Sequence, residues 1–210
     1  GEWADRYGGA DHPSGPACDR QDGDVVLVTH DHHYDPDGVR RVAGEDATLV
    51  VYEDVDADRI DRAVEPPEEL PYDVRRVGYG DTVDAAGVTV EAVPAYNDPD
   101  GPNVDADGEP FHPEGFGCGF RFVVDDTACL WPGDSDALPA HEAVDASLLL
   151  PSISRSFTMD RHGAADLAEA VDPDLVVPIH YNTFPDLRAD SGAFAADVAG
   201  RSVPVALDER

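Results

Sequence analysis

The chain has 210 residues, 41% of them hydrophobic, which is enough for one domain with a sizeable core, and its repeated apolar runs exclude a disordered acidic chain. Its 45 acidic side chains against 14 basic ones, all arginine, give a formal net charge of -31, which argues against nucleic acids and anionic membranes as partners because both bind Lys and Arg. Such self-repulsion is tolerated best where salt shortens the Debye length to about 3 Å near 1 M, so we expect a cytoplasmic protein from a halophile.

The apolar runs are short and predict strands. Residues 1–23 are rich in Gly, Pro and Asp and are expected to be irregular. The first strand is expected at Val25–Thr29, an uninterrupted apolar run of the kind found in sheets that are buried on both faces. Further strands are expected at Leu49–Tyr52, Val74–Val77, Val88–Ala92, Phe120–Val124, Ala128–Trp131, Ser147–Leu150, Leu175–Ile179 and Val203–Val205. No run approaches the roughly 18 apolar residues of a membrane span.

Helices are expected between these strands. Asp35 followed by Pro36 is typical of a helix start, and the helix that it opens is expected to end at Gly44. Further helices are expected at Asp56–Val64, after a cap at Thr158 or Asp160, and at Ser191–Ala199. The segment 98–119 has loop composition over a length that is typical of an active-site wall or lid. Strands that interleave with helices indicate a single α/β domain over residues 1–210.

Several of the apolar runs end in a residue that can bind a metal ion, namely His30, Asn97, Asp134 and His180. The ends of neighbouring strands in an α/β sheet open into a common crevice, so we expect these residues to converge. His30 and His32 are two residues apart, and continued strand geometry would point both imidazoles the same way. Because imidazole nitrogen and carboxylate oxygen are ligands that zinc prefers, the pattern indicates a metal site.

The segment THDHHYDPDG resembles the metal-binding signature of the metallo-β-lactamase-fold hydrolases, which reads His-x-His-x-Asp-His. VPAYN, FHPEGFGCGF, WPGDSD and VVPIHYNTF follow in the order seen in the branch that includes the ascorbate-phosphate lactonases, and the acidic composition resembles that of a haloarchaeal member. The resemblance implies an αββα four-layer sandwich with metal ions at one edge of two facing sheets, here without the family's N-terminal hairpin. It also implies a hydrolase that uses a metal-bound hydroxide on a small-molecule substrate such as a lactone, an ester or a phosphodiester.

Carried over by position, the resemblance makes His30 and His32 ligands of a first ion, Asp134 a carboxylate that bridges two ions, and His180 a ligand of the second. Asp35 is the candidate for the aspartate of the signature, both as a ligand and as the group that orients the attacking water and accepts its proton. It stands three residues after His32, whereas the family's aspartate stands two residues after the second histidine.

One ligand of the second ion is lacking in the motif, because Pro36 occupies the position of the histidine that follows the aspartate. A further histidine of many relatives is Asn97 here, and His112 is a candidate for supplying that imidazole. The resemblance implies one or two divalent ions, with zinc expected and Mn²⁺ as the alternative because it accepts oxygen ligands. Tyr181 and Asn182 directly follow the last histidine and are expected to contact the substrate or the developing oxyanion.

Some residues keep more than one interpretation. His112 fits a ligand, a substrate contact or a solvated loop residue, and Asp134 also fits an ordinary turn aspartate. His33 fits a group that supports the site or faces the substrate, and alternatively it replaces His32 as a ligand. The remaining histidines match no motif and are expected at the surface: His12, His141 and His162. The three cysteines are expected to be small buried thiols, because their spacing fits no zinc site: Cys18, Cys118 and Cys129.

Two other functions remain open. A degenerate member of the family that binds metal or a ligand without turnover would account for Pro36 and for the shifted Asp35. A nuclease or RNA-processing relative would use the same metal site, although the lack of lysine and the net charge argue against it.

Overall fold

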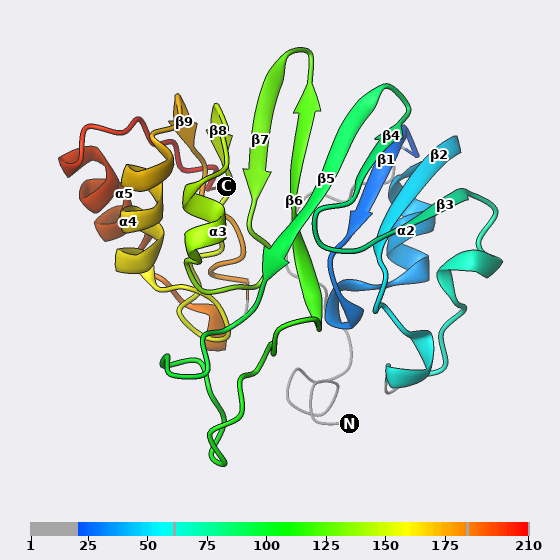
Figure 1. Ribbon diagram of the computed structural model, residues 1–210, viewed down its shortest axis with the longest axis horizontal. Coiled ribbons are helices and arrows are strands. Elements are labelled where there is room, and N and C mark those ends of the chain that lie inside the picture. The colour runs from blue at the N-terminus through cyan, green and yellow to red at the C-terminus, as the bar shows by residue number, and fades with distance from the viewer. Residues whose placement is uncertain (1–20, 61, 184, 210) are drawn as a thin grey trace.

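The strands form two sheets (Figure 1) in the computed structural model, which describes residues 21–60, 62–183 and 185–209. The smaller sheet is parallel in the order β1-β2-β3, with β1 at Gly23–Val28, β2 at Ala43–Tyr52 and β3 at Asp73–Val77. The larger sheet has the order β4-β5-β6-β7-β8-β9, with β4 at Thr82–Ala85, β5 at Val88–Ala95, β6 at Gly117–Val124, β7 at Thr127–Trp131, β8 at Leu148–Leu149 and β9 at Leu175–Val176. It is antiparallel from β4 to β7 and parallel from β7 to β9.

Helices cover the outer sides of the two sheets. Helix α2 (Pro36–Val42) contacts β1 and β2, whereas α3 (Pro139–Glu142), α4 (Arg161–Val171) and α5 (Ser191–Gly200) lie beside the larger sheet (Figure 1). Short 3-10 turns complete the connections: η1 at Asp31–His33, η2 at Ala57–Arg59, η3 at Pro67–Glu69 and η4 at Pro185–Leu187. The predicted α/β sandwich is therefore confirmed. No helix in the described part of the chain is long and apolar enough to cross a membrane.

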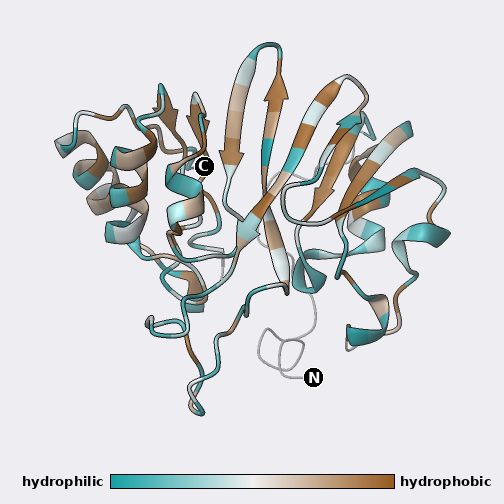
Figure 2. Cartoon of the chain, in the orientation of Figure 1, coloured by the Kyte–Doolittle hydropathy of each residue, from teal (hydrophilic) through white to brown (hydrophobic). Residues whose placement is uncertain are grey.

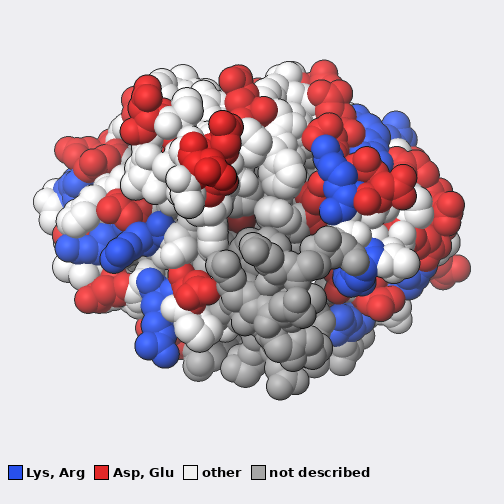
Figure 3. Space-filling view, turned by 90° about the horizontal axis from the view of Figure 1, so that it is seen from below, with Lys and Arg blue, Asp and Glu red and all other residues white. Residues whose placement is uncertain are grey.

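Two apolar cores hold these layers together. One lies between the sheets and joins β2 residues such as Leu49 and Val51 to Phe120 of β6. The other lies between the larger sheet and its helices, and it includes Leu149 and the fully buried Phe194 of α5. In Figure 2 the hydrophobic colour follows the strands and the inner faces of the helices, whereas the connecting loops are hydrophilic. Figure 3 shows acidic side chains spread over the face seen from below, with basic ones among them.

Several predicted elements need correction. The helix expected at Asp56–Val64 is wrong, because among the described residues of this segment only η2 is helical. Gly44 does not end α2: the chain leaves the helix after Val42 and Gly44 already belongs to β2. Asp160, not Thr158, caps α4 by accepting the N–H groups of His162 and Gly163.

The edges of the larger sheet also differ from the expectation. β4 was not predicted, although its alternating exposure fits an edge strand that forms a hairpin with β5. The strand expected at Val203–Val205 is reduced to a single bridge between Val176 and Val205. The expectations for the N-terminal segment, including the lack of a hairpin, His12 and Cys18, lie largely outside the described residues. The expectation of a single domain over residues 1–210 stays a prediction.

Candidate metal centre

One edge of the two sheets gathers five histidines and one aspartate. They lie in the loops at the lower ends of β1, β5 and β7 in Figure 1 and in the segment after β9. The residues are His30, His32, His33, His112, Asp134 and His180. The structure thus brings together three of the four predicted strand-end residues, His30, Asp134 and His180. The candidate ligands His32 and His112 join them. So does His33, for which the sequence left open a supporting role, a contact with the substrate, or the replacement of His32 as a ligand.

The turn after β1 determines where its three histidines point. The chain does not stay extended but enters η1, in which His33 N–H donates to His30 O and Tyr34 N–H donates to Asp31 O, both at 3.1 Å. The tight turn brings the ring centres of His32 and His33 to 5.1 and 4.5 Å, respectively, from the ring centre of His30. The expectation of continued strand geometry is thus wrong, and its failure explains why three imidazoles, not two, meet here.

Hydrogen bonds to the side chain of Asp31 stabilise this turn. Its buried carboxylate accepts the backbone N–H of Asp56 and the Nε–H of Arg59, both at 2.8 Å. The guanidinium of Arg59 in turn lies 5.9 Å from the ring centre of Phe116, which contacts the imidazoles of His30, His32 and His112. The charged pair and the aromatic ring therefore close one side of the cluster.

A close approach of the two sheets positions His30. The N–H of Cys118 donates to Thr29 O at 3.1 Å, which ties the end of β1 to β6. A side chain at Gly117 would place its Cβ only 2.9 Å from the Cβ of His30. Glycine at this position is therefore required for the imidazole to lie where it does.

Asp134 projects into the centre of the cluster from a rigid turn. Gly133 has a φ of +71° and passes so close to Cys118 O that a Cβ would lie 2.6 Å from it. The hydroxyl of Ser135 donates to Tyr96 O at 2.9 Å and accepts the N–H of Tyr96 at 3.0 Å. Because both neighbours are fixed, the carboxylate of Asp134, only 7% exposed, is held among the imidazoles.

The distances around Asp134 fit atoms that share metal ions. Its Oδ2 lies 3.7, 3.5, 3.9 and 3.4 Å from the Nε2 atoms of His30, His33, His112 and His180. Direct hydrogen bonds would be about 2.7 to 3.2 Å long. Two ligand atoms that each lie about 2.1 Å from one tetrahedral ion are about 3.4 Å apart. The spacing is therefore that of a ligand shell.

The ligand atoms fall into two overlapping groups. Those of His30, His32 and His112 lie within 4.8 Å of one another, and so do those of His30, His33 and Asp134. The Nε2 atoms of His30 and His112 are buried and have no hydrogen-bond partner in the described part of the chain. Since a buried polar atom without a partner is costly, these nitrogens fit a metal ion as their partner.

Hydrogen bonds to the opposite ring nitrogens orient both of these imidazoles. Nδ1 of His30 bonds with the Thr29 hydroxyl at 2.9 Å. Nδ1 of His112 lies 3.2 Å from both Asn97 Oδ1 and Phe157 O, and donation to these oxygens leaves its Nε2 with a free lone pair. Such contacts behind a histidine are how proteins orient metal ligands.

Asn97 holds His112 and is not itself placed as a ligand. Its Oδ1 accepts the backbone N–H of His112 at 3.0 Å, its Nδ2 donates to Phe157 O at 3.0 Å, and its own N–H donates to His112 O at 2.8 Å. Both residues are buried, with 1% and 3% of their surfaces exposed. Of the three interpretations for His112, the solvated loop residue is therefore wrong.

The protonation states suit cation binding. Burial lowers the pKa values of His30, His32 and His33 below the ordinary histidine value and lowers that of His112 to about 4, so these imidazoles are neutral and keep a lone pair at neutral pH. Burial by itself would raise the pKa of Asp134, but the surrounding imidazoles hold it below the usual range. The centre thus combines neutral nitrogen donors with one carboxylate.

The structure does not bring Asp35 into the cluster, which corrects the sequence-based assignment. Its carboxylate caps α2 by accepting the N–H of Asp37 at 3.2 Å, and it pairs with Arg62 at 2.9 Å. Although partial burial opposes the shift, the hydrogen bond from Arg62 lowers the pKa of Asp35. Tyr34 is also turned away, since its buried hydroxyl donates to Glu65 O at 2.7 Å.

Tyr181 and Asn182 are not among the residues of the cluster, and their contact with the substrate or the oxyanion stays a prediction. Both line a cavity of about 490 Å³ together with His180 of the cluster and with Ser191 and Glu209. Burial and the neighbouring Glu209 raise the pKa of Tyr181 to about 12. Asn182 organises its own loop, because its N–H donates to Leu187 O and its Oδ1 accepts the N–H of Ala189.

Two other predictions concern residues away from the centre. His141 was expected at the surface, but it is fully buried, with Nδ1 accepting the N–H of Leu138 and Nε2–H donating to Pro94 O. His162 is exposed as predicted. Cys118 and Cys129 are buried free thiols, as predicted.

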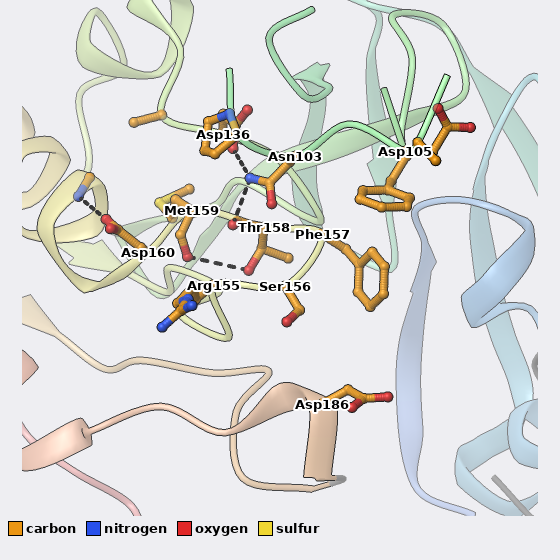
Figure 4. Close-up of a pocket in the computed structure, with 15 residues that line it drawn as sticks. Asn103, Asp105, Asp136, Arg155, Ser156, Phe157, Thr158, Met159, Asp160 and Asp186 are labelled. Carbon is orange, nitrogen blue, oxygen red and sulfur yellow. Dashed lines mark hydrogen bonds between the residues drawn. The ribbon is translucent and has the colours of Figure 1, made fainter. Parts of the chain in front are cut away.

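A cavity of about 1000 Å³ (Figure 4) is lined by residues of the segments that precede His112 and follow Ser154. Phe157 and Phe111, whose rings pack edge to face with centres 4.8 Å apart, line it on the side of His112. In Figure 4 Arg155 and Ser156 lie on one wall, and Asp186 lies on the segment across from them. A cavity of this size can accept a small molecule.

Comparison with known proteins decides the family. The model of the beta-lactamase superfamily domain matches residues 8–180. A UPF0173 metal-dependent hydrolase from Pyrococcus horikoshii is 31% identical over 201 residues, which cover 90% of this chain and 80% of the relative. The chain belongs to this family of metal-dependent hydrolases in the metallo-β-lactamase superfamily. The superfamily that the sequence motifs suggested is thereby confirmed.

Further similarities agree with this assignment. A UPF0173 metal-dependent hydrolase from Methanopyrus kandleri is 28% identical over 185 residues, which cover 86% of this chain and 76% of the relative. Igni18, a metallo hydrolase from Ignicoccus hospitalis, has a TM-score of 0.64 at 22% identity, with 89% of this chain and 76% of that chain covered. This likeness confirms the metallo-β-lactamase fold.

Proposed function

We propose that the protein hydrolyses a lactone, an ester or a phosphodiester of a small molecule, using at least one divalent ion held by His30, His32 and His112 next to Asp134. The observation that carries the proposal is the arrangement of four imidazole nitrogens, two of them buried and without a partner among the described residues, at 3.4 to 3.9 Å from one carboxylate oxygen. Family membership supports hydrolysis, and the likeness of the motif order to the ascorbate-phosphate lactonases supports a lactone as the first substrate to test. Three imidazoles favour zinc over a harder ion such as Mn²⁺.

A divalent ion held by these residues would supply Lewis-acid chemistry, activating a water molecule near neutral pH and polarising the carbonyl or phosphoryl oxygen under attack. The chain supplies the remaining requirements. Thr29 and Asn97 orient the imidazoles of His30 and His112, Asp134 balances the positive charge, and the ring of Phe116 packs against three of the histidines. A ligand shell that is fixed beforehand needs little reorganisation during the reaction.

We propose that the substrate also carries an anionic group. Among the described residues that line the larger cavity, Arg155 is the one with a positive charge. Four aspartates also line the cavity, and three of them already accept backbone N–H groups, namely Asp105, Asp136 and Asp160; the fourth is Asp186. Arg155→Ala is expected to raise KM for substrates with a carboxylate or phosphate and to leave kcat and neutral substrates nearly unchanged. Equal KM values for parent and variant on anionic substrates would contradict this assignment.

We also propose that the protein works in the salt-rich cytoplasm of a halophile. The formal net charge of -31 and the wide distribution of acidic side chains in Figure 3 support this setting. Small molecules, not nucleic acids or membranes, are the proposed partners, because a polyanionic partner would be repelled.

The test compares metal content and turnover in protein that is prepared and assayed in high salt. The parent is expected to hydrolyse at least one member of a panel of lactones, esters and phosphodiesters, to lose activity on chelation and to regain it with Zn²⁺ or Mn²⁺. His30→Ala is expected to abolish both metal binding and turnover, whereas His162→Ala, an exposed histidine outside the centre, is the matched control. Metal binding without turnover on any substrate would favour a binding protein over an enzyme.

A further inference from the structure

The second half of the metal-binding signature does not provide ligands in this chain. Pro36 has no donor, Tyr34 is buried against Glu65, and Asp35 is engaged by the start of α2 and by Arg62. A chain that relied on these three positions would lack part of a second ion site.

His33 lies where a replacement is needed. It occupies the variable position of the signature, and in an extended strand it would point away from His32. Because η1 is a 3-10 turn, its Nε2 instead lies 3.5 Å from Asp134 Oδ2, and its ring centre lies 4.5 Å from that of His30. The side chain is 35% exposed, so it forms the solvent-facing rim of the cluster.

His180 faces His33 across the same carboxylate. Its Nε2 lies 3.4 Å from Asp134 Oδ2, and the two rings are 5.4 Å apart at 33°. The backbone of His180 has a φ of +53°, an uncommon conformation for a residue other than glycine, and the preceding Ile179 is held by hydrogen bonds to residues 151 and 153. Its Nδ1 is buried and has no hydrogen-bond partner among the described residues. The ring is thus held at the centre by the backbone.

We propose that His33, Asp134 and His180 form a second site for a divalent ion, in which His33 takes the place of the motif's aspartate and histidine. This inference rests on the proposed function, which requires only the first site. Two imidazoles and one carboxylate are the three protein ligands of many catalytic zinc sites, and they leave positions open for water or substrate. Asp134 would then be shared, because its Oδ2 is nearly equidistant from the histidines of both sites.

The alternative is that Asp35 turns inward when metal binds. This rearrangement would break the cap of α2 and the ion pair with Arg62. Loss of a helix cap destabilises the folded protein. Asp35→Ala therefore separates the two assignments, since only the alternative makes that carboxylate a ligand.

The experiment counts bound ions by elemental analysis and calorimetric titration with Zn²⁺, in high salt, for the parent and four variants. The parent is expected to bind two ions per chain, and His33→Ala and His180→Ala one each. His112→Ala is expected to lose the other ion, whereas Asp35→Ala should keep two ions with only a modest loss of stability. Circular dichroism checks that each variant folds. If His33→Ala fails to fold, His33→Asn takes its place.

The outcomes separate this inference from the proposed function. Two ions in His33→Ala, or one ion in Asp35→Ala, would overturn the assignment of His33. A single ion in the parent that His112→Ala removes and His33→Ala keeps would overturn the second site and leave the proposed function standing. A parent that binds no ion would overturn both.

Discussion

Asn97→Ala tests whether the hydrogen bonds behind His112 set the metal affinity. In the folded protein the Asn97 side chain accepts the backbone N–H of His112 at 3.0 Å, lies 3.2 Å from its Nδ1, and donates to Phe157 O at 3.0 Å. The alanine variant leaves the buried N–H of His112 without a partner, which costs about 1 to 3 kcal/mol of unfolding free energy. It also frees the ring to turn, and loss of such a supporting contact weakens metal binding by about 10- to 100-fold.

Asn103→Ala is the matched control. Asn103 is another buried amide of the same loop, and its Nδ2 donates to Asp136 Oδ1 at 2.5 Å and to Thr158 O at 3.0 Å. This variant is expected to lose a similar unfolding free energy but to keep the metal affinity of the parent, because Asn103 touches no proposed ligand. Unfolding is measured with denaturant in the presence of a chelator, and affinity by competition with a chromophoric chelator. Parent-like affinity in Asn97→Ala, or an equal loss of affinity in Asn103→Ala, would refute the reasoning.

Three further predictions concern packing, thiols and salt. Gly117→Ala should lower the unfolding free energy by about 1 to 3 kcal/mol and weaken metal binding, because the new Cβ would lie 2.9 Å from the Cβ of His30. Gly200→Ala, with open space around it, should change neither quantity. Equal denaturant midpoints and metal affinities for both variants would contradict this prediction. Burial raises the pKa values of Cys118 and Cys129, so peptide mapping should find both thiols unalkylated at pH 8 in folded protein and alkylated in denaturant; rapid native labelling would be inconsistent with the described burial. The unfolding free energy should rise between 0.1 and about 2 M KCl as the charge of -31 is screened, and a flat or falling dependence would count against the halophilic assignment.

The residues that meet at the centre could be predicted in part because the ends of the strands can be recognised in the sequence, where each apolar run stops. An apolar run that stops at His30, Asp134 or His180 places that residue at the sheet edge whatever the details of packing. The family signature then identified the superfamily, which the comparisons confirm.

The local errors have a common physical cause. In the sequence, an aspartate before Pro36 is equally suited to cap a helix or to bind a metal, and only the position of Arg62 shows that Asp35 does the former. His33 was considered as a ligand only in place of His32, and not beside it, because a strand has a period of two, whereas the turn that follows β1 has a period of three. The three consecutive polar residues at 31–33, before a capped helix, were the signal that could have indicated the turn.

Longer-range contacts also limited the prediction. His141 matches no motif, and its burial depends on the carbonyl of Pro94, which is 47 residues away along the chain. The hydrogen bonds between Asn97 and His112 likewise join residues that are 15 apart in the sequence. The loop between them is held in place by further hydrogen bonds to Asp136 and Phe157. Neither contact leaves a pattern in the sequence.

Anomalous diffraction from crystals that are grown with Zn²⁺, measured at the zinc absorption edge, tests the central claim most directly. The account predicts one anomalous peak among the Nε2 atoms of His30, His32 and His112, and a second beside Asp134 between His33 and His180. Peaks confined to surface carboxylates, or a peak coordinated by Asp35, would contradict it.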